Sequence, residues 1–138
     1  MTFLFLYRLA MKQPLLLLLS LLAAAPAFAA RAEDLREAKS VLEQAVAAHP
    51  GNAELRVHLA FVDQKLGDAA GAQREFEQAV KDDPTKAEAR YMLGLLYEKQ
   101  GAKDKALGEW KACLAAASDE GMKETAQRHI HLLEATKR

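Results

Sequence analysis

Apolar residues recur at helical spacing along the chain from about residue 33 onward. Near the C-terminus, Met122, Ala126, Ile130 and Leu133 form one apolar stripe with polar residues between them, which is typical of a helix that packs by one face. No stretch indicates a β-strand. The pattern predicts six helices, at residues 33–48, 53–66, 69–82, 86–100, 103–117 and 119–136.

Glycine and proline separate the predicted helices. Gly67 and Gly101 each end the first helix of a pair, because glycine tolerates the left-handed conformation just after a helix. Pro50 and Pro84 stop the second helix of a pair, and Asn52 is a candidate N-cap for the helix that follows Pro50. These signals predict helical hairpins joined by short turns.

Residues of the same kind recur 34 positions apart. The pairs are Pro50/Pro84, Ala53/Ala87, Glu54/Glu88, Arg56/Arg90, Leu59/Leu93, Lys65/Lys99, Gly67/Gly101 and Glu75/Glu109. Three sets extend over three copies: the small residues Ala38, Ala72 and Ala106, the large Leu42, Phe76 and Trp110, and the small Ala45, Ala79 and Cys113. A period that keeps size as well as polarity indicates a repeated packing unit.

The pattern resembles the tetratricopeptide repeat, a pair of antiparallel helices of about 34 residues. One copy reads Leu93-Gly94-x-x-Tyr97 and continues with Ala106 and Trp110. The copy before it reads Leu59-Ala60-x-x-Asp63 and continues with Ala72, Phe76, Ala79 and Pro84. The resemblance covers about residues 34–118.

Some positions depart from the family pattern. Arg56 and Arg90 replace the early tryptophan, Asp63 stands where tyrosine is usual, and Ser118 replaces the closing proline. The family tolerates such changes, and the agreement of two and a half copies in one register is the stronger signal.

The resemblance implies an all-α fold, a short α-solenoid of antiparallel helix hairpins. We expect two full repeats at about 53–84 and 87–118, an N-terminal half repeat at 33–50, and a C-terminal capping helix at 119–136. The first helix that the half repeat lacks would fall at 19–32, where Pro26 would break it. The half repeat should therefore act as an N-terminal lid.

The first thirty residues differ from the rest. They contain no acidic residue, begin with a basic region and end in small residues before Ala29, which is typical of a secretory signal peptide. We expect residues 1–29 to be cleaved after Ala29, leaving a helical domain of residues 30–138, exported to the periplasm in a bacterium with two membranes. Met11 is an alternative start. The other interpretation is a retained inner-membrane anchor, although residues 14–30 lie at the lower limit of a bilayer span.

Length and charge restrict the remaining possibilities. At 138 residues the chain suits one domain besides that segment, and 19 basic residues balance 19 acidic ones. This balance gives no electrostatic reason to expect nucleic acid as a partner. The single cysteine, Cys113, excludes an intrachain disulfide framework.

Candidate chemistry is sparse, so we expect no enzyme, no cofactor and no metal. His129-x-His131 is the one close histidine pair, and residues two apart on a helix do not face each other. The acids Asp82 and Asp83 precede a proline and favour a solvated loop over an acid/base site. Cys113 occupies a small core position, with a reactive exposed thiol as the alternative, and Trp110 is core by register.

The surface most suited to binding is the concave face, which the first helix of each pair lines in this family. Its predicted contact residues are Val57, Phe61, Gln64, Tyr91, Leu95 and Glu98, with Glu54 and Glu88 at the edge. Lysine and asparagine, which grip a peptide carboxylate in one subclass of the family, are not found at these positions. An apolar groove with acidic and amide edges suits an extended or helical peptide.

The function predicted from the sequence is that of a non-enzymatic adaptor that binds another protein in the cell envelope. By analogy with exported relatives of this fold, it would serve an assembly system such as cytochrome maturation, pilus or outer-membrane machinery. One alternative is a self-associating structural protein whose groove is its own oligomer interface, and another is a groove filled by the lid or the cap. Retention of the N-terminal segment would place the protein near a membrane.

Overall fold

The computed structural model describes the backbone of residues 13–136 and the side chains of residues 31–136. The chain divides into two compact units, Met1–Glu37 and Ala38–Arg138. The hairpins and the predicted contact residues all belong to the second unit, to which the packing described below refers. The proposed cleavage after Ala29 lies in a part whose side chains are outside the described residues.

Six helices and no strand make up the described part of the chain. They are α2 (Gln13–Ala48), α3 (Ala53–Lys65), α4 (Ala69–Asp82), α5 (Ala87–Lys99), α6 (Lys103–Ala116) and α7 (Glu120–Ala135). The α-solenoid of helix hairpins predicted from the sequence is confirmed, and the last five helices begin and end within a residue or so of the expected positions.

The first helix is longer than expected. We predicted a start at residue 33 and a break at Pro26, but α2 begins at Gln13 and runs through Pro26 without interruption. A proline inside a helix removes one backbone hydrogen bond, whereas the leucines and alanines on either side are strong helix formers. The prediction of a separate short helix was wrong because it weighed the proline above its neighbours.

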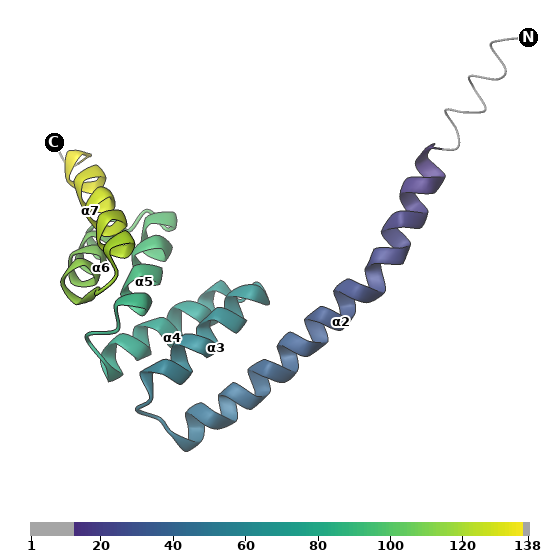
Figure 1. Ribbon diagram of the computed structural model, residues 1–138, viewed down its shortest axis with the longest axis horizontal. Helices are drawn as coiled ribbons and strands as arrows, with labels where there is room; N and C mark the ends of the chain where they lie inside the picture. Colours follow the sequence, from purple (N-terminus) through teal and green to yellow (C-terminus); the bar gives the residue numbers. More distant parts are fainter. Residues whose placement is uncertain (1–12, 137–138) are drawn as a thin grey trace, which may run out of the picture. The chain divides into compact units, whose positions relative to one another are not determined.

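Two hairpins and a final helix form the solenoid. In Figure 1, α3 lies along α4 and α5 along α6, α4 also contacts α5, and α7 packs on α6. Both hairpin turns use glycine as predicted, with φ of 84° at Gly67 and 74° at Gly101. At each turn the amides of the glycine and of the residue after it donate to carbonyls in the last turn of the helix, which is the Schellman arrangement that favours glycine.

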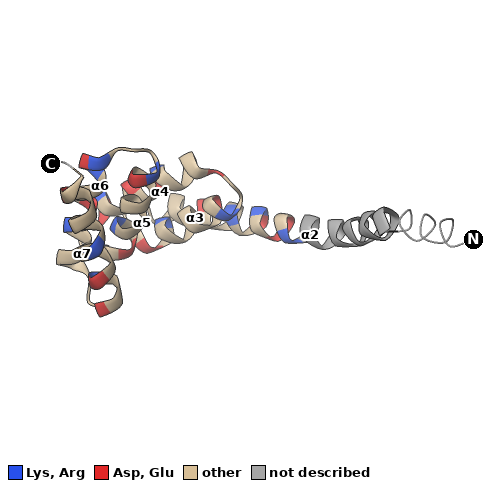
Figure 2. Ribbon diagram, turned by 90° about the horizontal axis from the view of Figure 1, so that it is seen from above, with Lys and Arg blue, Asp and Glu red and all other residues tan. Residues whose placement is uncertain are grey.

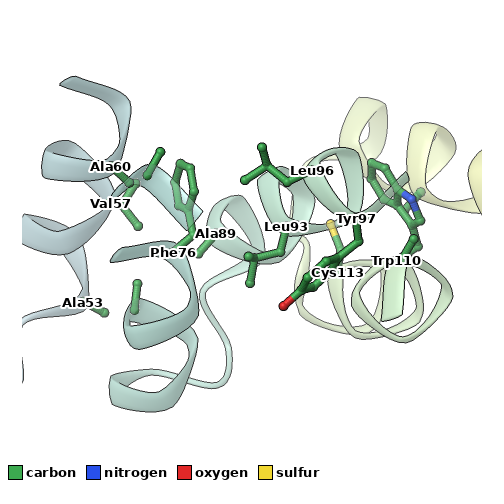
Figure 3. Packing of buried hydrophobic residues seen from close by; sticks show 14 of the residues in the cluster. Ala53, Val57, Ala60, Phe76, Ala89, Leu93, Leu96, Tyr97, Trp110 and Cys113 are labelled. Atoms are coloured by element: carbon green, nitrogen blue, oxygen red, sulfur yellow. The ribbon is translucent and has the colours of Figure 1, made fainter. Parts of the chain in front are cut away.

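The residues that recur every 34 positions form the core of both hairpins. Phe76 and Trp110 are fully buried, as are the small residues at the other two repeated positions, Ala72, Ala79, Ala106 and Cys113. Figure 3 shows Phe76 between Val57 and Ala60 of α3 and Ala89 of α5. The large and small positions therefore form one continuous cluster.

The size of each aromatic residue matches the small residue opposite it in the adjacent helix. A Cβ atom on Gly94 would lie only 2.6 Å from the Trp110 ring, so the second hairpin needs glycine where it carries the larger indole. The first hairpin carries the smaller Phe76 and has room for Ala60 at the equivalent position. The difference between the two copies thus preserves close packing.

The arginines that replace the family's tryptophan form a polar clamp in each repeat. Arg56 binds Glu75 at 3.1 Å and donates to the carbonyl oxygen of Pro50 at 2.8 Å. In the next repeat Arg90 binds Glu109 at 3.0 Å and donates to the carbonyl oxygen of Pro84 at 2.7 Å. Each clamp joins the two helices of a hairpin to the turn before it, which explains why these polar residues share the 34-residue period.

The half repeat is held differently. Asp63, which replaces the expected tyrosine, is 3% exposed, and its Oδ1 lies 2.6 Å from Nζ of Lys39 in α2. Oδ1 has no aligned hydrogen bond within the described residues, so the contact is an ion pair. The nearby carboxylate raises the pKa of Lys39 above its ordinary value. Of residues 31–48 in α2, whose side chains the structure describes, none joins the hydrophobic core cluster.

The outer surface mixes charges of both signs. Figure 2 shows acidic and basic residues interspersed over α3 to α7. Within the part of the chain that the structure describes, no helix combines the length and the apolar character needed to cross a bilayer.

Candidate partner-binding site

Helices α3 and α5 carry the six predicted contact residues, and one of them does not reach the surface. Val57 is 1% exposed and belongs to the core cluster. The prediction that it contacts a partner was therefore wrong. It followed from the register alone, and a short valine side chain at this position ends inside the hairpin, whereas Tyr91 at the same register is half-buried.

Three apolar residues lie at the boundary between core and solvent. Phe61, Tyr91 and Leu95 are half-buried and pack against the core cluster. The Phe61 ring meets Phe76 edge-on at 5.3 Å, and the Tyr91 ring meets Trp110 edge-on at 5.1 Å. Such edge-to-face contacts fix the orientation of each ring. These side chains are therefore rigid apolar positions that the core supports from one side.

The two polar contact residues have different surroundings. Gln64 is exposed on α3. Glu98 on α5 is instead engaged within the molecule, because its Oε1 accepts a hydrogen bond from Trp110 Nε1 at 2.5 Å and contacts His129 Nδ1 at 2.7 Å. Glu98 thus satisfies the polar atom of a buried indole and joins α5, α6 and α7.

The histidine pair behaves as separate residues. His129 stacks on Trp110 with ring centroids 4.4 Å apart and 18° between the planes, while His131 is exposed. Among the described residues, no group of three or more histidine, cysteine, aspartate or glutamate side chains is placed to hold a metal ion.

Sequence reasoning missed one exposed apolar residue on α7. Leu132 is 59% exposed and follows His129 by three residues, so both lie on the same side of the helix. Because His129 touches Glu98, this side of α7 lies toward α5. The signal was present in the sequence as a leucine outside the apolar stripe of α7.

The remaining candidates for chemistry have structural roles. Cys113 is fully buried, as expected for a small core residue, and burial raises the pKa of its thiol. Asp82 ends α4 and binds Arg56 Nε at 2.6 Å. Although burial opposes its ionisation, the hydrogen bonds from Gln78 and Arg56 lower the pKa of Asp82. Asp83 accepts from the Thr85 hydroxyl, which lowers the pKa of Asp83.

Two open cavities lie at the turns between repeats, where the predicted edge residues Glu54 and Glu88 are the only predicted contact residues in their described linings. One, of about 740 Å³, is lined mainly by residues 48–54 together with Asp83 and Lys86. The other, of about 350 Å³, is lined by residues of the 83–88 turn and by residues between Ala116 and Met122. A glutamate and a lysine, Glu54 and Lys86, form an ion pair at the first cavity. Polar loop residues form most of the lining of both cavities, and this lining suggests no particular ligand.

Comparison with known families decides the kind of repeat. Two family models, both described as tetratricopeptide repeat, match residues 29–75 and 62–120. The chain belongs to the tetratricopeptide-repeat family. Together the matched residues span the half repeat and both hairpins and end at the first residue of α7.

Solved structures with the same fold include two proteins whose titles name a chaperone or a chaperone binding region. One is PcrH in complex with the chaperone binding region of PopD, with a TM-score of 0.67 and 15% identity over 78% of this chain and 84% of that one. Another is the type III secretion translocator chaperone SycD of Yersinia enterocolitica, with a TM-score of 0.62 and 16% identity over 78% of this chain and 74% of that one. At these identities the likeness extends to the fold alone. No curated protein matches the chain.

Proposed function

We propose that this tetratricopeptide-repeat protein is a non-enzymatic adaptor that binds a segment of another protein along α3, α5 and α7. The binding surface, called here the contact face, consists of Phe61, Gln64, Tyr91, Leu95 and Leu132. The observation that carries the proposal is the support of Phe61 and Tyr91 by the buried rings of Phe76 and Trp110.

Rigid, half-exposed rings suit binding because little conformational entropy is lost when a partner covers them. Tyrosine and other aromatic side chains are also enriched where interfaces are most strongly stabilised. Gln64 and the edge residues Glu54 and Glu88 would supply polar contacts around this apolar strip. Glu98 is excluded from direct recognition in this proposal, since Trp110 and His129 already occupy its carboxylate.

The structural neighbours support this kind of partner. PcrH was solved with a segment of another protein bound to it, and SycD is a chaperone of translocator proteins. We extend from them only the kind of partner, a protein segment, and not its identity. The signal-peptide pattern of residues 1–29 supports placement of the adaptor in the cell envelope.

The test is capture of the tagged full-length protein from gently solubilised envelopes, with co-purifying proteins identified by mass spectrometry. The variant Gln64→Arg/Leu132→Arg changes two exposed positions, so its fold should be intact, and it should lose the partner. Tyr91→Arg is less suitable, because Tyr91 packs on Trp110 and its loss would also disturb the core. Lys103→Glu, on an exposed part of α6, is the control.

A partner protein should be recovered with the wild type and with Lys103→Glu but not with the double variant. Equal recovery with all three proteins would show that the contact face is not the binding surface. Circular dichroism spectra of the three proteins should coincide, which separates lost binding from lost folding.

A further inference from the structure

Helix α7 extends the 34-residue register of the repeats by one more helix. Ile130 is buried in the core cluster, as is Leu96, which stands 34 residues earlier on α5. In the same register, His129 stands in the place of the contact residues Leu95 and Phe61. One row of equivalent positions therefore crosses α3, α5 and α7, and its third member is a histidine after two apolar residues.

The neighbouring helices hold His129 in one orientation. Its ring stacks on Trp110 of α6 with the ring centroids 4.4 Å apart, and its Nδ1 lies 2.7 Å from Oε1 of Glu98 in α5. The same oxygen accepts a hydrogen bond from Trp110 Nε1, so the carboxylate is itself fixed. Packing on one helix and a hydrogen bond to another leave the imidazole little freedom to turn.

The contact with Glu98 determines which ring nitrogen carries the proton. A carboxylate oxygen only accepts hydrogen bonds, so Nδ1 of His129 is the donor, and in a neutral imidazole the other nitrogen is then an acceptor. The one buried side-chain nitrogen or oxygen without a hydrogen bond among the described residues is Oδ1 of Asp63. Nε2 of His129 has no hydrogen bond to these residues either, so its lone pair is open to solvent.

An accessible acceptor of this kind can select between partners. Solvent can satisfy Nε2 in the free protein, but a partner that covers the ring displaces this solvent. A partner with a hydrogen-bond donor at this place replaces the lost contact. A partner without one leaves the nitrogen unsatisfied, which weakens its binding.

We infer that His129 is a specificity-determining residue beside the contact face, and that its Nε2 accepts a hydrogen bond from the bound protein segment. This inference rests on the proposed function. The segment that fits the row places apolar side chains on Phe61 and Leu95 and a hydroxyl or amide N–H group on His129. Because this acceptor lies at one end of the row, it favours one direction of the segment across α3, α5 and α7.

The protonated nitrogen of His129 can be identified without a partner. Nitrogen NMR of the full-length protein with isotope-labelled histidine, at about pH 8 where imidazole is mostly neutral, should show His129 protonated at Nδ1 alone. Its signals are assigned by their absence from His129→Asn. His131, which is exposed on the same helix, should exchange between both tautomers. A His129 ring that is protonated at Nε2 under these conditions would overturn the inference.

The recognition role is tested with the asparagine variant. In His129→Asn the amide nitrogen takes the place of Nδ1 and can still donate to Glu98, whereas no atom takes the place of Nε2. The full-length variant should recover the partner from solubilised envelopes about fivefold less than the wild type does. His131→Asn, the matched control, should recover it equally, and circular dichroism spectra of all three proteins should coincide.

The outcomes separate this inference from the proposed function. If His129→Asn recovered the partner as well as the wild type did, while Gln64→Arg/Leu132→Arg lost it, His129 would have no role in recognition and the contact face would stand. If the wild type itself recovered no partner, the proposed function would fail, and the recognition role of His129 would fail with it.

Discussion

Helices α2, α4 and α6 each carry the repeated pattern of one large residue between two small ones, but the three helices bury it to different extents. In α4 and α6 the pattern is fully buried, while in the second unit's part of α2 it is half-exposed. The sequences of the three faces are equally apolar, so composition does not account for the difference. What α4 and α6 have, and α2 lacks within that unit, is the first helix of the same hairpin.

This difference shows that the repeated pattern determines which face of a helix can be buried, whereas the neighbouring helix determines whether it is buried. The same comparison distinguishes two ways in which neighbouring helices are held together. The hairpins are held by packing of large against small side chains, while α2 is held to α3 by the ion pair of Lys39 with Asp63. The comparison can be tested by making the same change at equivalent positions.

The largest effect should come from the large repeated position. Trp110→Ala should lower the free energy of unfolding by about 3–5 kcal/mol, because it leaves a cavity and deprives Glu98 of its donor. Leu42→Ala should cost less than about 1 kcal/mol, since Leu42 is half-exposed. Urea unfolding of dilute protein measures both values. Similar costs at the two positions would mean that α2 is packed as tightly as α6.

Overpacking at the small position should distinguish the same two regions. Ala72→Leu should destabilise the protein by about 1–3 kcal/mol, because Ala72 is fully buried between packed helices. Ala38→Leu, the same change 34 residues earlier, should leave the melting temperature of the dilute protein nearly unchanged. A tolerated leucine at position 72 would contradict the hairpin register.

The ion pair should make a smaller contribution. Lys39→Ala leaves the buried Asp63 carboxylate without its cation and should cost about 1–2 kcal/mol. Lys65→Ala, which removes an exposed lysine from the end of α3, is the matched control and should be nearly neutral. If both changes cost the same, the Asp63 contact does not hold α2.

The smallest effect is a pH dependence in alkaline solution. Burial and the hydrogen bond to Glu77 raise the pKa of Tyr97 from 10.0 to about 12. Between these values the unfolded chain has lost a proton that the folded chain retains, so the free energy of unfolding falls as the pH rises. Tyr97→Phe should make this decline shallower in denaturant titrations. The decline that remains would include Lys39, whose pKa is also raised. An unchanged slope in the variant would rule out this role of Tyr97.

Most of the fold can be predicted from the sequence, because the 34-residue period shows both which positions of a repeat are packed inside and how large the side chain at each of them is. Gly67, Gly101 and Pro84 mark helix ends that depend on backbone conformation alone, and these ends were predicted well. The continuation of α2 through Pro26 was not predicted, because it depends on whether one helix-breaking proline outweighs the many helix-forming residues around it. Arg56 and Arg90 were noted as a repeated pair and as departures from the family pattern, but their ion pairs were not predicted, because the glutamate partners lie nineteen residues away in the next helix.

The burial and internal contacts of the expected contact residues were predicted less completely than the fold. A register identifies the side of a helix but not the depth that a side chain reaches, so Val57 and Tyr91 were treated alike although only Val57 is buried. Glu98 was predicted as a contact residue because its interactions with Trp110 and His129 arise from tertiary packing. Leu132 was missed because α7 was considered only as a cap.

The most direct test of the central claim is photo-crosslinking in living cells from a single position on the contact face. A photoreactive amino acid at Gln64 should give an adduct with one other protein, and the same amino acid at Lys103 on α6 should give none. An adduct with a distinct protein from Gln64 alone is the result that the account predicts. The same adducts from both positions, or no adduct from Gln64, would contradict the claim that this face binds a partner.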